Sequence, residues 1–218
     1  RPDYLPLQIS MVEARASGRT DSIRLVLASA SPRRLALLQQ IGVTPDEVIP
    51  ADIDEAPGLT ERPREHALRL AQEKCAVVAT KEARAYCLAA DTVVAVGRRI
   101  LPKVGDVETA RRCLEVMSGR SHDVFTGVSI IAPNGRKSDR VVRSRVTFKR
   151  LSALEMEAYL LSGEWDGKAG GYAIQGRAAA LIEGVSGSYT GIVGLPLHET
   201  YKMLTGLSYP VELAAGAD

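Results

Sequence analysis

Asp91 interrupts an otherwise apolar segment, residues 87–96, that ends at Gly97. A short apolar run of this kind is typical of a strand buried in a sheet, and no stretch of the chain reaches the roughly 18 apolar residues of a membrane-spanning helix. A carboxylate in such a strand is costly to bury unless a cation, a metal ion or several donors lie beside it. Buried carboxylates are frequent at active sites; the alternative is an aspartate that caps a neighbouring turn.

Strand-like and helix-like segments alternate along the chain and predict the α/β class with a mixed sheet. An apolar run at 24–28 precedes a helix at 32–41, and Gly42 ends that helix. The turn at 133–135 predicts an antiparallel hairpin. The other predicted segments are helices at 63–85, 152–163 (with Ser152 and Glu155 as a capping box) and 196–204, a helix from Asp106 to Gly119, strands at 124–132, 137–148, 179–183 and 189–193, and loops at 46–60 and 163–176.

The composition is that of an ordinary globular protein. Of 218 residues, 45% are hydrophobic and 25% are charged, and the net charge of +2 argues against a general nucleic-acid-binding protein. No membrane partner is indicated. Three widely spaced cysteines, Cys75, Cys87 and Cys113, predict core or free thiols in a reducing, cytoplasmic environment. We expect a loosely attached extension at 1–22 in place of a secretory signal, one domain at 23–207 and a tail at 208–218.

Two arginines fall in the first turn of the predicted helix at 32–41. Ser31 is a good N-cap and Pro32 a good first helical residue, so Arg33 and Arg34 lie at the positive end of the helix dipole. Each positive charge there destabilises the helix by about 0.3–1 kcal/mol if it is exposed. They become favourable if a phosphate binds, because free N–H groups, the hydroxyls of Ser29 and Ser31 and two guanidinium groups then converge on it. The alternative is that both arginines point into solvent.

A glycine-rich segment at 166–176 lets the backbone approach a ligand closely, and it carries Lys168 and Gln175. Its spacing fits neither a Walker A loop nor a dinucleotide fingerprint, and a plain surface loop explains it equally well. The chain has no local Ser-His-Asp or Cys-His signature. Phosphate donors, a buried carboxylate and no nucleophile together point to metal-assisted hydrolysis by water.

Other polar residues are weaker candidates, since solvated surface charge is the default for each. They are the lysines Lys74 and Lys103, the acidic cluster Asp52, Asp54 and Glu55, which could help to hold a divalent ion, and the histidines His66, His122 and His198, which share no ligand spacing.

Several of these segments, in this order, resemble the Maf family of nucleotide pyrophosphatases. The matching stretches are LASASPRR from Leu27, RLAQEKC around Lys74, AADTVV around Asp91, GKAGGYAIQG ending at Gly176 and GSYTGIVGLPLHET from Gly187. The resemblance covers residues 25–204. It implies an elongated, two-lobed α/β fold related to the inosine-triphosphatase architecture, with a cleft between the lobes and frequent pairing into a homodimer. It also implies hydrolysis of nucleoside triphosphates at the α-phosphorus, with a divalent metal (Mg²⁺, Mn²⁺ or Co²⁺), to a monophosphate and pyrophosphate.

The resemblance also implies roles for individual residues. Asp91 matches the family's catalytic carboxylate. Asp91 and Glu55 together match the family's metal ligands. The Asp-Thr pair implies the branch that acts on dTTP, UTP and modified pyrimidine triphosphates, whereas a sister branch prefers 7-methyl-GTP. One departure is Lys103-Val104, where the family commonly has Lys-Pro. The remaining matches are Arg34, Thr92 and Gln175 at positions linked to substrate choice, and Ser29, Arg33, Lys74, Lys103 and Lys168 around the phosphates.

These expectations combine into one mechanistic hypothesis. Cationic side chains and the metal neutralise the triphosphate, and Asp91 orients and deprotonates the water that attacks the α-phosphorus. The cations concerned are Arg33, Arg34, Lys74 and Lys103. Two alternatives stay open: a nucleotide-binding regulator of septum formation with little catalysis, and a pyrophosphatase directed at purines or 7-methyl-GTP.

Overall fold

A seven-stranded mixed sheet forms the centre of the molecule, as predicted for the α/β class. The computed structural model describes residues 23–211. The strand order is β2-β1-β3-β5-β6-β7, and β4 pairs with β3 beside this path. The pairs β2·β1 and β1·β3 are parallel and the others antiparallel. The strands are β1 (Arg24–Leu27), β2 (Glu47–Val48), β3 (Ala85–Val96), β4 (Arg99–Leu101), β5 (Ser121–Ile131), β6 (Lys137–Phe148) and β7 (Ile182–Ser186).

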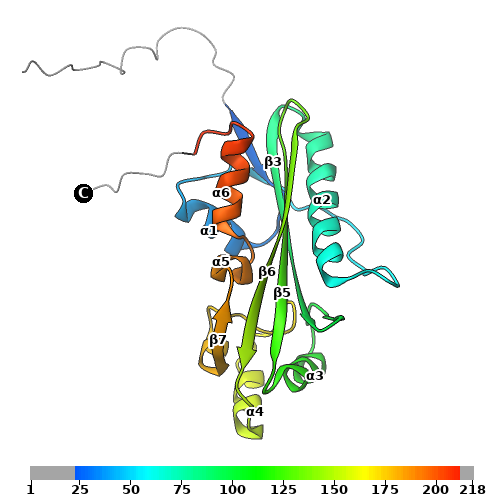
Figure 1. The fold of residues 1–218 in the computed structure, drawn as a ribbon, viewed down its shortest axis with the longest axis vertical. Coiled ribbons are helices and arrows are strands. Elements are labelled where there is room, and N and C mark those ends of the chain that lie inside the picture. The colour runs from blue at the N-terminus through cyan, green and yellow to red at the C-terminus, as the bar shows by residue number, and fades with distance from the viewer. Residues whose placement is uncertain (1–22, 212–218) are drawn as a thin grey trace, which may run out of the picture.

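Helices cover both faces of this sheet and gather at the two ends of its long strands. Figure 1 shows β3, β5 and β6 along the long axis, with α2 on one face, α1, α5 and α6 on the other, and α3 and α4 at the far end. This arrangement is the elongated, two-lobed shape that the family resemblance implies. The helices are α1 (Pro32–Gln40), α2 (Pro63–Lys81), α3 (Val107–Met117), α4 (Ala153–Leu161), α5 (Tyr189–Val193), α6 (Leu197–Gly206) and the 3₁₀ helix η1 (Arg177–Leu181).

Two predicted strands near the C-terminus are wrong. Residues 189–193 form the helix α5, because the Ser188 side chain accepts a hydrogen bond from Gly191 N at 3.0 Å and starts a helical turn. This local bond outweighs the strand preference of the β-branched residues in the segment. Of the predicted strand at 179–183, most lies in the alanine-rich η1, and β7 begins only at Ile182.

Other boundaries differ by smaller amounts. α2 ends at Lys81, four residues before its predicted end, because β3 begins at Ala85. The predicted loop at 46–60 contains the two-residue β2, and the prediction missed β4. The capping box of α4 and the hairpin are confirmed. The expected extension at 1–22 and most of the expected tail lie outside the described residues.

Apolar side chains fill both sides of the sheet, and the cysteines lie among them. Cys75, Cys87 and Cys113 are buried and free, as expected for core thiols. Burial raises the pKa of the Cys75 thiol to about 12, which keeps it protonated and unreactive. Within residues 23–211, no helix is both long enough and apolar enough to cross a bilayer.

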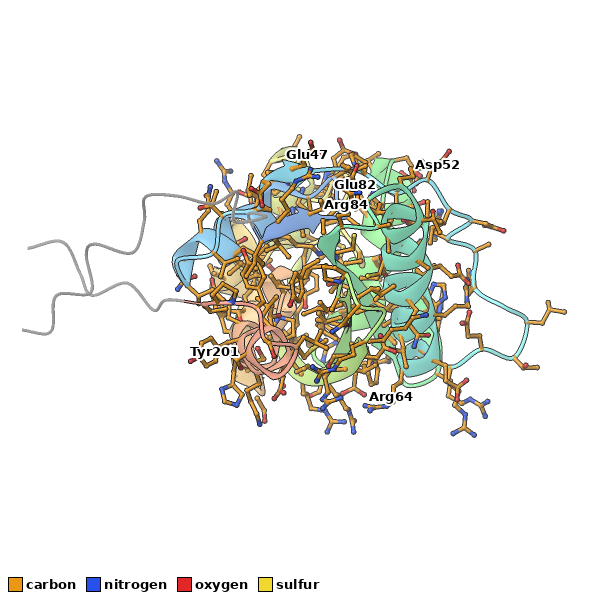
Figure 2. All side chains as sticks on the ribbon, turned by 90° about the horizontal axis from the view of Figure 1, so that it is seen from above. Glu47, Asp52, Arg64, Glu82, Arg84 and Tyr201 are labelled. Atoms are coloured by element: carbon orange, nitrogen blue, oxygen red, sulfur yellow. The ribbon has the colours of Figure 1, made fainter. Side chains whose placement is uncertain are left out.

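An ion-pair network joins the ends of three elements at one edge of the sheet. Arg24 of β1 lies 3.3 Å from both Glu47 of β2 and Glu82, which follows α2. Figure 2 labels Glu47 and Glu82 and shows them at the same side of the molecule. The network is partly exposed, so its contribution to stability is small.

Gly127 of β5 lets α2 approach the sheet more closely than any side chain would permit. A Cβ atom at this position would lie 2.2 Å from the backbone oxygen of Ala67 in α2. Gly127 is also the cross-strand neighbour of Asp91. The glycine therefore sets the distance between α2 and the part of β3 that carries the buried carboxylate.

Replacing Gly127 by alanine should destabilise the fold, because the new methyl group meets backbone atoms that cannot rotate away. We expect Gly127→Ala to lower the free energy of unfolding by about 1–3 kcal/mol or more, measured by urea denaturation. The control is Gly184→Ala, whose Cβ meets no atom within 4 Å. Equal stability of the two variants would contradict the proposed close approach.

Candidate active site

In the described part of the chain, strand β3 is unpaired along part of one side, at Asp91 and Thr92, which leaves a gap in the sheet between β1 and β4. Residues 85–88 of β3 pair with β1, and residues 94–96 pair with β4. Between them, residues 89–93 have no strand partner on that edge within the described chain. A cleft of about 600 Å³ opens at this gap. Because side chains alternate along a strand, Asp91 and Thr92 reach the cleft from opposite faces of the sheet.

On the α2 face, Lys74 lies between two carboxylates. Its Nζ is 2.6 Å from Asp91 Oδ1 and 2.5 Å from Glu55 Oε1. Lys74 and Asp91 are each only 8% exposed, so the default interpretation of Lys74 as a solvated surface charge is wrong. The burial follows from the close packing of α2 on β5. Lys74 supplies the partner that a buried Asp91 requires.

Glu55 comes from the loop that precedes α2 and is half exposed. Partial burial alone would raise the pKa of the Glu55 carboxyl, but the hydrogen bond and charge of Lys74 lower it below its ordinary value. Glu55 is therefore ionised at neutral pH and adds negative charge beside Lys74. Of the acidic cluster, it is the residue that lines the cleft, whereas Asp54 accepts a hydrogen bond from Ala56 N at 2.9 Å.

On the opposite face, Arg34 connects α1 to β3 and to the end of α5. Its Nε donates to Gly194 O at 2.9 Å, its Nη1 to Ser29 Oγ at 3.1 Å, and its Nη2 to Thr92 Oγ1 at 3.4 Å. Burial lowers the pKa of Arg34, and the nearby Asp91 charge partly offsets this effect. Arg34 is therefore engaged by the protein itself and does not point into solvent.

Arg33 lies beside Arg34 and is less buried. Its Nε donates to Val193 O at 3.4 Å, and burial lowers its pKa. Ser31 occupies the N-cap position as predicted, but its side chain makes no capping hydrogen bond. Instead, Ser31 N donates to Ser29 Oγ at 3.2 Å, so the turn before α1 is held by Ser29.

The glycine-rich segment packs against residues 102–104, which follow β4 and include Lys103. Val104 N donates to Lys168 O at 3.0 Å, and Gly170 N donates to Pro102 O at 2.9 Å. Gly170 has a φ of +67°, and a Cβ there would lie 2.9 Å from Val94, so this approach requires glycine. The segment is thus a packed part of the site rather than a plain surface loop, and it brings Lys103 and Lys168 to the same cleft.

The buried side chain of His122, for which the sequence predicted no role, contacts Tyr172 of this segment. His122 is 2% exposed, and its Nε2 lies 2.8 Å from the Tyr172 hydroxyl. Burial lowers the pKa of His122 to about 4, so the ring is neutral at physiological pH. No sequence spacing indicated this contact, because the two residues come from distant segments that only the fold brings together.

All eleven residues to which the sequence assigned a catalytic, substrate-binding or metal-binding role line this one cleft. Five are cations and two are carboxylates, so the cleft carries a positive excess that suits a ligand with several phosphates. The two carboxylates converge on the position that Lys74 Nζ holds. The lining residues from the sequence are Ser29, Ser31, Arg33, Arg34, Glu55, Lys74, Asp91, Thr92, Lys103, Lys168 and Gln175.

Several known proteins are similar to this chain over most of its length. The Maf-like protein family model matches residues 24–207. The dTTP/UTP pyrophosphatase of Caulobacter vibrioides is 59% identical over 185 residues, which cover 85% of this chain and 96% of that protein. The dTTP/UTP pyrophosphatase of Paramagnetospirillum magneticum is 58% identical over 85% of this chain and 97% of its own length. A HAM1 protein from Coxiella burnetii aligns with a TM-score of 0.47 and 17% identity, over 84% of this chain and 99% of that one.

The loop that carries Glu55 is held on α2 by Glu61. The Glu61 carboxylate accepts hydrogen bonds from Arg69 Nε at 2.7 Å and from Gly58 N at 2.9 Å, and it lies 2.9 Å from His66 Nδ1. The Arg69 contact is the main reason that the pKa of Glu61 is lowered to about 2. Glu61 thereby orders the residues that follow Glu55.

Glu61→Gln should remove this anchor and lower the free energy of unfolding at pH 7 by about 1–2 kcal/mol, allowing for solvent screening. Because the folded-state pKa of Glu61 is depressed, its stabilisation is present above the ordinary glutamate pKa and is lost as the pH falls towards 2. The difference between wild type and variant should therefore shrink below about pH 5 in urea unfolding series.

The matched control is Glu73→Gln, because Glu73 contacts the same Arg69 at 3.1 Å but is more exposed. It should change stability by less than about 0.5 kcal/mol. A loss for Glu61→Gln that did not depend on pH would contradict the assignment.

Proposed function

Since this chain belongs to the Maf family, we propose that it hydrolyses nucleoside triphosphates, chiefly dTTP and UTP, to a nucleoside monophosphate and pyrophosphate. The observation that carries the proposal is the buried Asp91–Lys74 pair at the gap in the sheet, surrounded by cations from three other segments. Relatives that cover nearly the whole described chain bear the name dTTP/UTP pyrophosphatase and support this substrate class.

The cations have different tasks in this proposal. Arg34 is used for internal hydrogen bonds, whereas Arg33, Lys103 and Lys168 face the cleft from two sides. Their charges neutralise the triphosphate and stabilise the negative charge that develops on the leaving pyrophosphate. Burial and the neighbouring Arg33 lower the pKa of Lys168, as expected where several cations share one cleft.

Asp91 is the residue we assign to the attacking water. Its carboxylate orients the water and accepts one of its protons as the water oxygen bonds to the α-phosphorus. The bond from the α-phosphorus to the bridging oxygen breaks, and that oxygen leaves with pyrophosphate. Lys74, at 2.6 Å, holds the carboxylate in place. A positioned general base of this kind contributes about 10²–10⁴-fold to the rate.

We extend the proposal to a divalent cation, Mg²⁺, Mn²⁺ or Co²⁺, held by Glu55 and Asp91. Within residues 23–211, no cluster of three or more His, Cys, Asp or Glu side chains forms a complete metal site. Glu55 and Asp91 each use one carboxylate oxygen for Lys74 and keep the other, and Mg²⁺ is commonly held by one or two carboxylates together with substrate phosphates. When bound, the cation would neutralise phosphate charge and polarise the phosphoryl group. The expected homodimer, cytoplasmic location and link to cell division stay predictions.

The test is pyrophosphate release from dTTP, UTP, CTP, ATP, GTP and 7-methyl-GTP, with Mg²⁺, Mn²⁺ or Co²⁺ and with an EDTA control. We expect metal-dependent release led by dTTP and UTP. Asp91→Asn should lower kcat by about 10²–10⁴-fold. Glu183→Gln, an exposed carboxylate on β7, is the control and should keep wild-type turnover.

Each other outcome corrects a defined part of the proposal. Release led by 7-methyl-GTP would overturn the substrate class, and near-native turnover of Asp91→Asn would overturn the role of Asp91. Binding without release from any triphosphate would favour a nucleotide-binding regulator.

A further inference from the structure

Thr126 lies behind the cleft, on the face of the sheet opposite Asp91. It belongs to β5, is the cross-strand neighbour of Thr92, and is only 1% exposed. Its Oγ1 lies 2.7 Å from Gly191 O of α5 and 3.2 Å from Thr92 Oγ1. Thr126 therefore connects a residue that lines the cleft to the backbone of α5 without reaching the cleft itself.

The hydrogen positions in this contact follow from counting donors. A carbonyl oxygen can only accept, so Thr126 must donate its single hydroxyl hydrogen to Gly191 O. Towards Thr92, Thr126 can then act only as an acceptor. The Thr92 hydroxyl hydrogen therefore points to Thr126, away from the cleft.

A second contact shows that Thr92 Oγ1 also accepts a hydrogen bond. Arg34 Nη2 can only donate, and it lies 3.4 Å from Thr92 Oγ1. Thr92 is partly exposed and lines the cleft. A hydroxyl oxygen has two lone pairs, so one is left for a ligand. The Thr92 hydroxyl therefore offers the cleft an acceptor and no donor.

We propose that Thr126 is a positioning residue that fixes the direction of the Thr92 hydroxyl, so that the cleft selects a base with an N–H donor. The inference rests on the proposed function and names the basis of its substrate choice. Uracil and thymine carry a hydrogen on N3, whereas cytosine has a lone pair there. An acceptor in the cleft therefore favours UTP and dTTP over CTP, which would place two lone pairs against each other.

The test compares Thr126→Val, which keeps the shape but removes the hydroxyl, with Thr126→Ser, which keeps it. We expect wild type to prefer UTP over both CTP and N3-methyl-UTP in kcat/KM. In Thr126→Val the Thr92 hydroxyl can turn and donate into the cleft, so the UTP-to-CTP ratio should fall about tenfold, the worth of one hydrogen bond. The change should appear mainly in KM, and Thr126→Ser should restore the wild-type ratio within about threefold.

An unchanged UTP-to-CTP ratio in folded Thr126→Val, or an equal loss in Thr126→Ser, would overturn the inference. If Thr126→Val does not fold, the wild-type enzyme still tests the inference, because equal kcat/KM values for UTP and N3-methyl-UTP would also overturn it. Binding of UTP and CTP in EDTA separates this inference from the proposed function. Binding discrimination that is lost in Thr126→Val, without any turnover by wild type, would contradict the proposed function alone.

Discussion

The contact between Lys74 and Asp91 is the interaction on which the site depends. Either charge buried alone would cost several kcal/mol, so each requires the other. Two features of the backbone make the contact: the gap in the sheet edge at residues 89–93, and the close approach of α2 at Gly127. Glu55 adds a second carboxylate at 2.5 Å, which leaves the cluster with a negative excess beside a cationic cleft. That arrangement suits chemistry on a phosphate.

The alternation of side chains along β3 separates two tasks. Asp91 faces α2 and belongs to the part of the site that we assign to hydrolysis, while Thr92 faces α5 and belongs to the part that we assign to base selection. Arg34 and Thr126 hold Thr92 through hydrogen bonds to Gly194 and Gly191, so the short helix α5 shapes the second part. The glycine-rich segment adds Lys168 to the cleft by docking beside Lys103.

The sequence predicted the structural features that depend on interactions between residues close together in the chain. The buried strand around Asp91, the hairpin turn at 133–135 and the capping box of α4 depend on residues close together in the chain. Two features could not be read in this way, because they join distant segments: the burial of Lys74 depends on a glycine in another strand, and the contact of Thr126 with Thr92 requires the register of two strands. The helix α5 is a local feature that the prediction missed, because one serine bond outweighs the strand preference of the β-branched residues in the same segment.

A double-mutant cycle on Lys74 and Asp91 tests the central claim most directly, with the free energy of unfolding at pH 7 as the measurement. The variants are Lys74→Met, Asp91→Asn and their combination. We expect Lys74→Met to lose about 3–5 kcal/mol, because it leaves a buried carboxylate unpaired. The combined variant should lose less than the sum of the two single losses by at least about 2 kcal/mol. Losses that add to within about 0.5 kcal/mol would show that the two residues are not coupled and would contradict the account.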